Sequence, residues 1–249
     1  MHYFLEETIS LIDRISCRLS LNQLPLIFSM GDGAATIDLG NQLSESLNRK
    51  VLAMYLWLQQ NRFHGLKDII TAYASLTLVY DPSLIKMHYQ PVGTVFEWVY
   101  ERLQTAYRES GSGLNGTPSR HRIPVFYGGT NGPDLSRLAA AKGLDESAVI
   151  HIHTGKLYRV YMIGFLPGFS YMGEVEAAIA HPRKEKPITV MAGSVGIAGS
   201  QTGIYPFNSP GGWNIIGRTP LQMFNAHAQN PVLIKAGDEV EFYAAEEEA

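Results

Sequence analysis

The stretch from Tyr161 to Pro220 constrains the fold more than any other part of the sequence. Glycine, proline, serine or threonine interrupts it every few residues, so helices of ordinary length cannot form there. Between the interruptions lie short apolar pieces, namely YMIGFL, ITVMAGSVGIAG, TGIYPF and WNIIG. Short apolar runs bounded by turn residues are typical of β-strands joined by tight corners. The stretch therefore predicts a curved sheet or barrel with a cleft along its loops.

The first half of the chain has a different pattern, in which strand-like and helix-like runs alternate. Residues 26–40 have the pattern of a β-hairpin whose turn contains Gly31 and Gly33. Apolar residues recur at helical spacing over 41–62 and over 91–109. Two β-rich runs lie between them at 65–82. This ββαββα order predicts an α+β domain with its helices on one face of a small sheet.

A linker rich in small residues separates the two halves. The run SGSGLNGTPS at 110–119 has no apolar periodicity and is dominated by Gly, Ser, Asn and Pro. Near the N-terminus, Ile9, Ile12 and Leu19 recur at helical spacing, so we expect an amphipathic helix over 4–19. We therefore divide the chain into an N-terminal extension (1–22), an α+β domain (23–110), a linker (111–119) and a mainly-β domain (120–249).

Further elements of the C-terminal domain flank or overlap the punctuated stretch. The predicted elements are a strand (121–129), two helices (133–142 and 145–153), a strand (157–169) and a final hairpin (231–244). Asp145 is the expected N-cap of the second helix because its side chain can accept hydrogen bonds from the first helical turn. Gly237 is the expected turn residue of the hairpin.

The composition excludes several classes of function. Hydrophobic residues make up 45% of the 249-residue chain and charged residues 17%, which is typical of a packed globular protein. The net charge of −3 argues against a nucleic-acid partner, which needs a concentrated basic surface. The single cysteine, Cys17, excludes an internal disulfide, and no Cys/His cluster has zinc-ligand spacing, so we expect no metal site. With no secretory signal and no apolar run long enough to span a membrane, we expect a cytoplasmic protein.

Two familiar motifs in the punctuated stretch are misleading. Residues 212–219, GWNIIGRT, have the spacing of a phosphate-binding P-loop with arginine in place of lysine. A P-loop must lead into a helix N-terminus, whereas WNII is a strand-like run and Pro220 follows at once, so we assign no P-loop. Ser170, Ser194 and Ser200 lie in no G-x-S-x-G elbow, which argues against a serine hydrolase.

Three residues remain candidates for chemistry. His151 and His153 are two residues apart and cannot share one helical face, so a metal pair is not expected. His153 alone could act as a general acid or base, or could lie at a helix end for structural reasons. Arg183 and Arg218 are isolated cations in glycine-rich surroundings. Such a guanidinium can hold a carboxylate or phosphate in bidentate fashion, or bond loop carbonyls instead.

Aromatic residues accompany these two cations. We expect about half of them to lie in the core and the rest to wall a cleft. The set comprises Phe165, Phe169, Tyr171, Tyr205, Phe207 and Trp213.

Five segments of the C-terminal half resemble those of a known family. They read IPVFYGGTNGPDL, IGFLPGFSYMG, HPR, MAGSVGIAGSQTGIYP and SPGGWNIIGRTPLQMF, in this order. In length, order and spacing they are similar to the motifs of the KipI / allophanate hydrolase subunit 1 family, which includes PxpB, a component of 5-oxoprolinase. The resemblance covers residues 120–243 closely and the preceding domain, through GDGAATIDLG and YDP, more loosely.

The resemblance implies a cyclophilin-like β-barrel in the C-terminal domain and a function within a complex. The implied partners are a KipA / allophanate hydrolase subunit 2-like protein and a LamB/YcsF-like subunit, and together they convert 5-oxoproline and ATP, with Mg²⁺, to glutamate. The catalytic residues expected in this chain are His153, Arg183 and Arg218. The expected substrate-binding residues are Phe165, Pro167, Phe169, Gln201, Thr202, Tyr205 and Trp213.

Two alternatives stay open. The first is a regulatory binding protein that inhibits a histidine kinase, because a groove lined by Phe and Arg could hold a proline-containing loop. The second, hydrolysis of allophanate, comes from an older family name and ranks last. A cyclophilin-like fold by itself implies no prolyl isomerase activity, because function lies in the site rather than the fold.

Overall fold

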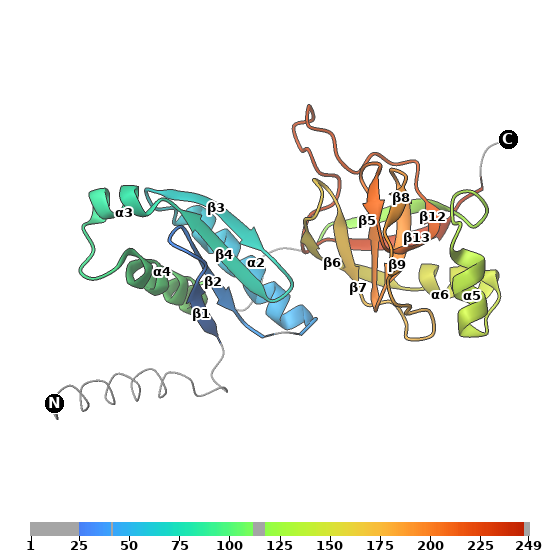
Figure 1. The fold of residues 1–249 in the computed structure, drawn as a ribbon, viewed down its shortest axis with the longest axis horizontal. Helices are drawn as coiled ribbons and strands as arrows, with labels where there is room; N and C mark the ends of the chain where they lie inside the picture. Colours follow the sequence, from blue (N-terminus) through green and yellow to red (C-terminus); the bar gives the residue numbers. More distant parts are fainter. Residues whose placement is uncertain (1–24, 41, 112–117, 247–249) are drawn as a thin grey trace, which may run out of the picture.

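The structure, a computed structural model, describes residues 25–40, 42–111 and 118–246. Separate hydrophobic cores distinguish a sheet unit, described over residues 25–40 and 42–111, from a barrel unit, residues 118–246. Figure 1 shows the two units side by side. The predicted extension with its helix at 4–19 and most of the predicted linker lie outside the described residues, so the predicted domain boundaries stay a prediction.

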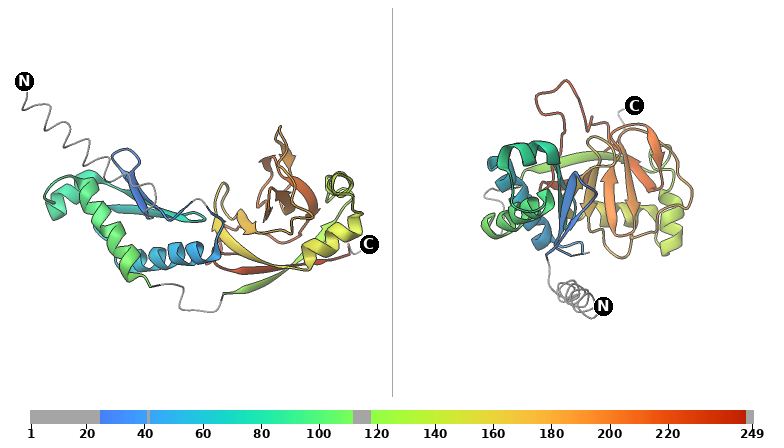
Figure 2. Two further views of the ribbon diagram at one scale, coloured as in Figure 1. Left: turned by 90° about the horizontal axis from the view of Figure 1, so that it is seen from below. Right: turned by 60° about the vertical axis from the view of Figure 1, so that its left-hand side comes forward.

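The sheet unit is a four-stranded antiparallel sheet with helices on one face. Its elements are β1 (Leu26–Ser29), β2 (Ala34–Asp38), α2 (Glu45–Gln60), β3 (Leu66–Thr71), β4 (Ser75–Tyr80), α3 (Pro82–Tyr89) and α4 (Val95–Glu109). The strand order is β1-β2-β4-β3. Helices α2 and α4 lie on the same side of the sheet (Figure 2), where their apolar faces enclose the first core. The predicted hairpin and both predicted helices are therefore confirmed.

Helix α3 is the element of this unit that the sequence did not predict. Asp81 directly follows the last residue of β4 and is the N-cap of α3. Its Oδ1 accepts hydrogen bonds from the backbone nitrogens of Ser83 and Leu84. Pro82 occupies the first turn, where a missing N–H costs nothing. The sequence Asp81-Pro82 indicates only the end of a strand. A helix of one apolar stripe and eight residues is too short for periodicity to reveal.

The barrel unit contains a closed barrel of seven strands, which confirms the barrel predicted from the punctuated stretch. Around the barrel the order is β10-β7-β6-β13-β5-β12-β9. The barrel strands are β5 (Arg120–Tyr127), β6 (Leu157–Ile163), β7 (Ser170–Gly173), β9 (Ser194–Ala198), β10 (Gln201–Ile204), β12 (Asn214–Arg218) and β13 (Glu239–Ala244). A separate pair, β8 (Ile188–Val190) and β11 (Ser209–Gly211), forms a two-stranded sheet beside it.

Two helices follow β5, as the sequence predicted. Helix α5 (Leu135–Lys142) ends at Gly143, which has a φ of 67°, and α6 (Glu146–Thr154) begins at Asp145. The Asp145 carboxylate accepts a hydrogen bond of 2.7 Å from the Ala148 nitrogen and serves as the predicted N-cap. Helix α5 packs on β12 and α6 on β13, so their apolar residues complete the barrel core.

The predicted hairpin over 231–244 is wrong. Only its second half is a strand, β13, which pairs in parallel with β5 and antiparallel with β6. The first half instead lies against the loop that precedes it in the chain, where the Leu233 nitrogen donates a hydrogen bond to the Met223 carbonyl. Gly237, with a φ of 95°, donates to the Val160 carbonyl and directs the chain into the barrel wall. Local sequence shows a turn here but not that the strand beyond it pairs with distant partners.

A buried asparagine ties the two units together. Asn48 of α2 is fully buried, and its Nδ2 donates to the carbonyls of Tyr161 (2.8 Å) and Tyr73 (3.1 Å). Its Oδ1 accepts from the Arg159 guanidinium at 3.3 Å. A buried amide and a buried guanidinium are stable only when hydrogen bonded, so this contact fixes the junction between the units.

Candidate functional site

Arg218 lies at the end of β12, where glycines let three strands approach closely. A Cβ on Gly217 would lie 2.5 Å from Val125 Cγ1 on the neighbouring strand β5. A Cβ on Gly193 would lie 2.2 Å from the Thr219 carbonyl oxygen. Neither contact is possible for a real side chain, so only glycine permits this packing. The close approach directs Arg218 into a pocket beside the barrel.

The Arg218 pocket has a volume of about 520 Å³, which is typical of small-molecule sites. Its described lining is Phe126, Asn131, Ala192, Gly193, Pro206, Phe207, Arg218, Thr219, Pro220, Leu221, Gln222 and Phe224. Arg218 is the one charged side chain of this lining. Its Nε donates to the Ala192 carbonyl at 2.9 Å, and no described carboxylate forms an ion pair with it. The guanidinium is therefore oriented by the protein but not neutralised by it.

The aromatic residues of the punctuated stretch form a cluster centred on Phe169. Its ring centroid lies 4.6 Å from that of Tyr171, 4.9 Å from Tyr205 and 5.3 Å from Trp213. Phe169 and Tyr205 are each 1% exposed, so they are core residues. Phe165 is 63% exposed and stands edge-on to Phe169, and Pro167 is exposed in the same loop.

Phe207 lies apart from this cluster and faces the Arg218 pocket. Its ring meets that of Phe224 at 5.7 Å in an edge-to-face arrangement. Gly168 of the loop that carries Phe165 packs on the same wall, since a Cβ there would lie 2.9 Å from the Phe224 Cβ. The predicted aromatic wall thus divides into a small core and one side of a pocket.

The second predicted arginine, Arg183, does not line the Arg218 pocket. It is exposed, forms no hydrogen bond or ion pair within the described chain, and lies against Gly212. Burial raises the pKa of Tyr205 to about 12, and the nearby positive charge of Arg183 partly opposes this effect. Arg183 therefore lies on the side of the aromatic cluster, away from the pocket lining that contains Arg218.

An ion-pair network that the sequence did not predict holds the loop carrying Arg183. Lys184 Nζ lies 2.5 Å from Asp134 Oδ2, close enough for an ion pair, although the approach is not aligned as a hydrogen bond. The same carboxylate oxygen accepts from the Ile215 nitrogen at 2.7 Å. Asn214 donates to the Pro182 carbonyl. These contacts connect the HPR segment to α5 and β12.

His153 occupies the barrel core. It is fully buried, with its Nδ1 2.7 Å from the Tyr127 hydroxyl and its Nε2 2.9 Å from the Thr202 hydroxyl. Burial lowers the pKa of His153 to about 3, so the ring is neutral at physiological pH. It can therefore make no ionic contact with the helix dipole. Both ring nitrogens have partners and Thr202 is equally buried, which favours a structural role for the pair over acid–base chemistry.

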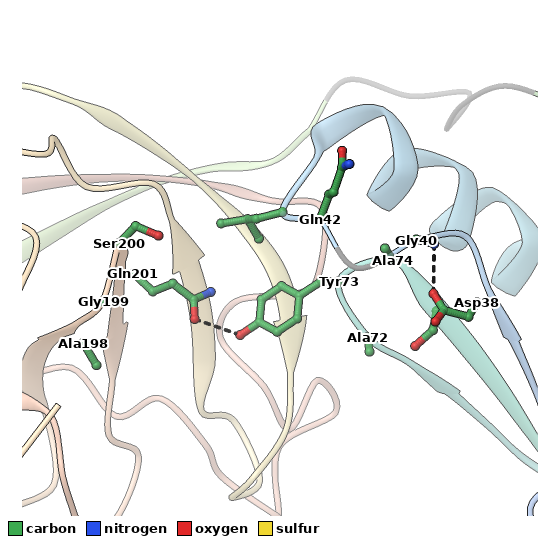
Figure 3. A pocket seen from close by; sticks show the side chains of 12 residues that line it. Asp38, Gly40, Gln42, Ala72, Tyr73, Ala74, Ala198, Gly199, Ser200 and Gln201 are labelled. Atoms are coloured by element: carbon green, nitrogen blue, oxygen red, sulfur yellow. Dashed lines mark hydrogen bonds between the residues drawn. The ribbon is translucent and has the colours of Figure 1, made fainter. Parts of the chain in front are cut away.

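Gln201 lines a second pocket, which lies at the junction of the two units and has a volume of about 450 Å³. Figure 3 shows it between Ala198–Gln201 of the barrel and Ala72–Ala74 of the sheet unit. The Tyr73 hydroxyl donates to Gln201 Oε1 at 3.2 Å across this junction pocket. Burial raises the pKa of Tyr73 to about 12, so its hydroxyl keeps the proton that it donates.

The sequence did not single out Asp38 and Tyr73, two of the side chains that the sheet unit contributes to this pocket. Asp38 is the one charged side chain in the described lining, and its Oδ1 accepts from the Gly40 nitrogen at 2.9 Å. Asp38 is the last residue of β2 and Tyr73 lies in the turn between β3 and β4, which is a weak signal that a site lies nearby. Among the described residues no group of three or more His, Cys, Asp or Glu side chains could hold a metal ion.

Comparison with known proteins places the chain in a family. Residues 25–234 match the family described as carboxyltransferase domain, subdomain C and D. A curated protein of Bacillus subtilis (strain 168), named as the B-type subunit of 5-oxoprolinase, is 40% identical over 218 residues, which cover 87% of this chain and 91% of that protein. A protein of the same name from Escherichia coli O157:H7 is 44% identical over 148 residues, covering 59% of this chain and 67% of that protein.

Several solved structures are similar to this chain in fold. The protein TTHA0988 is 36% identical and superposes with a TM-score of 0.74. The match covers 86% of this chain but only 40% of TTHA0988, which is the longer chain. Protein PH0987 from Pyrococcus horikoshii is 40% identical, with a TM-score of 0.51 over 89% of this chain and 98% of that one. The urea amidolyase of K. lactis, at 16% identity over 89% of this chain and 15% of that one, shares the fold with a TM-score of 0.71.

The chain belongs to the carboxyltransferase subdomain C and D family. Its relatives among the 5-oxoprolinase subunits confirm the predicted resemblance to the KipI / allophanate hydrolase subunit 1 family. The cyclophilin-like relationship of the barrel stays a prediction. No helix of the described residues is long and apolar enough to cross a membrane.

Proposed function

We propose that this chain is one subunit of an ATP-dependent 5-oxoprolinase, which opens 5-oxoproline to glutamate. The observation that carries the proposal is the 40% identity to the B-type subunit of the Bacillus subtilis 5-oxoprolinase, across nearly the whole length of that protein. The proposed partners are a KipA-like subunit and a LamB/YcsF-like subunit. The need for ATP, with Mg²⁺, would place the complex in the cytoplasm.

The proposed reaction explains why ATP is consumed. A lactam carbonyl is a weak electrophile because the ring nitrogen donates electron density to it. Transfer of a phosphoryl group from ATP to the lactam oxygen makes the carbon susceptible to water. The ring C–N bond then breaks, with a proton going to nitrogen, and a second water releases phosphate from the acyl phosphate. Such a site works by orienting charged groups and neutralising their charge.

The composition of the Arg218 pocket supports a subunit that is inactive alone. Its described lining contains no Asp, Glu, His, Lys or Cys side chain, so it offers no ordinary group for proton transfer. The buried His153 has both ring nitrogens engaged by Tyr127 and Thr202. Acid–base chemistry would then come from another subunit, and this chain would contribute binding and positioning.

The test is reconstitution of the complex. The chain is purified alone and with the KipA-like and LamB/YcsF-like proteins from the same source, and glutamate and ADP are measured after addition of 5-oxoproline. We expect equal amounts of both products from the complete complex with ATP and Mg²⁺, and neither from the chain alone. A complete complex that forms no glutamate, while the chain alone suppresses autophosphorylation of a histidine kinase, would favour the regulatory alternative instead.

A further inference from the structure

The Arg218 pocket contains one positive charge in an otherwise uncharged lining. Arg218 enters from β12, and the remaining described residues are apolar, amide or hydroxyl side chains or glycine. A pocket with a single unpaired cation attracts a ligand with a single negative charge, because each further charge on the ligand would be desolvated without compensation.

The guanidinium is held so that its outer edge is available. The Nε donates to the Ala192 carbonyl. A Cβ added to Gly193 would lie 3.4 Å from the Arg218 Cγ, so the aliphatic part of the arginine packs closely on this glycine. The Ala192 nitrogen in turn donates to Asn208 Oδ1 at 2.7 Å, which anchors this loop. Since one side of the guanidinium and its stem are fixed, the two terminal nitrogens form a pre-oriented fork for the two oxygens of a carboxylate.

The rest of the wall suits an uncharged ring. Phe207 and Phe224 meet edge to face, and Pro206 and Leu221 extend the same apolar surface. A flat ring of a few carbon atoms can pack on such a surface and gains free energy in proportion to the apolar area it buries. A sugar or a polyphosphate would gain little there.

We propose that the Arg218 pocket binds a small monocarboxylate carried on an uncharged ring, and that it does not bind the nucleotide. A nucleoside triphosphate carries several negative charges, whereas the described lining offers one cation and no helix N-terminus to hold them. The inference rests on the proposed function, in which the ring acid is 5-oxoproline. It assigns recognition of the organic substrate to this chain and binding of ATP to another subunit.

The experiment measures direct binding to the full chain by two-dimensional ¹H–¹⁵N NMR titration and by calorimetry. The probes are 5-oxoproline, cyclopentanecarboxylate, 2-pyrrolidinone, which lacks the carboxylate, and ATP with Mg²⁺. We expect both carboxylates to shift the backbone signals of residues 192, 193, 207 and 218. The uncharged lactam should bind about tenfold or more weakly, and ATP should leave these signals unchanged.

Substitutions identify the cation responsible. Arg218→Ala should weaken binding of both carboxylates by about 10- to 100-fold, because hydrogen bonds to a charged group are lost. Arg218→Lys should restore part of the affinity, since it keeps the charge but not the fork. The matched control is Arg122→Ala, which removes a largely exposed arginine of the same barrel and should leave binding unchanged. In the complex, Arg218→Lys should raise KM for 5-oxoproline and leave KM for ATP unchanged.

The outcomes separate this inference from the proposed function. Shifts of the pocket signals by ATP, or carboxylate binding that survives Arg218→Ala, would overturn the inference even if the complex is a 5-oxoprolinase. A complex without 5-oxoprolinase activity, together with Arg218-dependent binding of cyclopentanecarboxylate, would overturn the function and keep the site. Absence of carboxylate binding both to the chain alone and to the complex also overturns the inference.

Discussion

The Arg218 pocket and the junction pocket have opposite charge and different origins. The Arg218 pocket lies within the barrel unit and contains one cation and no acid among its described residues. The junction pocket lies between the units and contains one acid, Asp38, and no cation among its described residues. Two of its uncharged polar side chains, Tyr73 and Gln201, already bond each other. One pocket is therefore preset for an anion, and the other repels anions.

The difference shows that one pocket depends on a single unit and the other on the contact between the two units. The Arg218 pocket depends on glycine corners inside one unit, so it keeps its shape wherever the sheet unit lies. The junction pocket exists only while the two units are held together through Asn48 and Arg159. Disruption of the junction should therefore abolish one pocket and preserve the other, and this expectation can be tested.

The largest effect is expected from Asn48→Ala. The substitution removes hydrogen bonds from two buried carbonyls and leaves the buried Arg159 with poorer partners, so it should cost about 2–4 kcal/mol of unfolding free energy. Urea unfolding measures this loss. Asn61→Ala, at the exposed end of the same helix, is the control and should change stability by less than about 1 kcal/mol. Equal losses in the two variants would mean that Asn48 does not fix the junction. Carboxylate binding at Arg218 should survive Asn48→Ala under folding conditions.

A second prediction concerns pH and the barrel alone. The pKa of His153 is about 3 in the folded chain and near its ordinary value of 6.5 when unfolded. Below pH 6.5 the unfolded chain binds a proton that the folded chain does not, so folding stability falls as pH falls. The loss should reach about 2 kcal/mol between pH 7 and pH 5.

Denaturant unfolding of His153→Gln at both pH values tests this cause. The variant should be less stable at pH 7 but should lack this contribution to the pH dependence. His151→Gln, an exposed histidine of the same helix, should retain the full dependence of the parent chain. If all three proteins have the same slope of stability against pH, the buried imidazole is not its source.

A third prediction makes the Arg218 pocket resemble the junction pocket. Gln222 is an exposed part of the Arg218 pocket lining, and Gln222→Glu would add an acid to the lining that contains the unpaired cation. Binding of cyclopentanecarboxylate should weaken by about fivefold, corresponding to about 1 kcal/mol, and the loss should shrink at high salt. Gln59→Glu, with the same charge change on the sheet unit, is the control. An unchanged affinity in Gln222→Glu would show that charge does not select the ligand.

The smallest effect is expected from Tyr73→Phe. It removes the hydroxyl that reaches Gln201 across the junction and leaves the ring contacts in place. The loss of stability should be about 0.5–1.5 kcal/mol, the ordinary value of one neutral hydrogen bond. Thermal unfolding measures it. A loss as large as that of Asn48→Ala would mean that the junction depends on Tyr73 more than on the buried amide.

Local features of the fold could be predicted because each rests on a local rule. The glycine-rich corners predicted short strands, Gly143 and Asp145 marked helix ends, and the spacing of apolar residues revealed α2 and α4. The run WNII was predicted to be strand-like rather than part of a P-loop, and its last three residues do begin β12. In each case a few neighbouring residues decide the backbone conformation.

The arrangement of the candidate residues could not be predicted in this way. Arg183 and Arg218 looked equivalent in sequence, but the structure puts only Arg218 in a pocket with apolar walls. His153 looked like a helix-end residue, and only the barrel that closes around it shows that it is buried and neutral. Asp38 and Tyr73 gain their setting from contact with the other unit. All these properties depend on strands and units that lie far apart in the chain.

The insertion of β13 between β5 and β6 determines when the barrel can form during synthesis. Residues Arg120–Val125 of β5 pair with Glu239–Ala244 of β13, and the ribosome makes β13 last among the described strands. Until then one edge of β5 and one edge of β6 are open to other chains. The sheet unit, whose strands pair with near neighbours, can fold much earlier. A nascent chain should therefore carry a folded sheet unit beside an unfinished barrel, and this interval is when aggregation or chaperone binding is most expected.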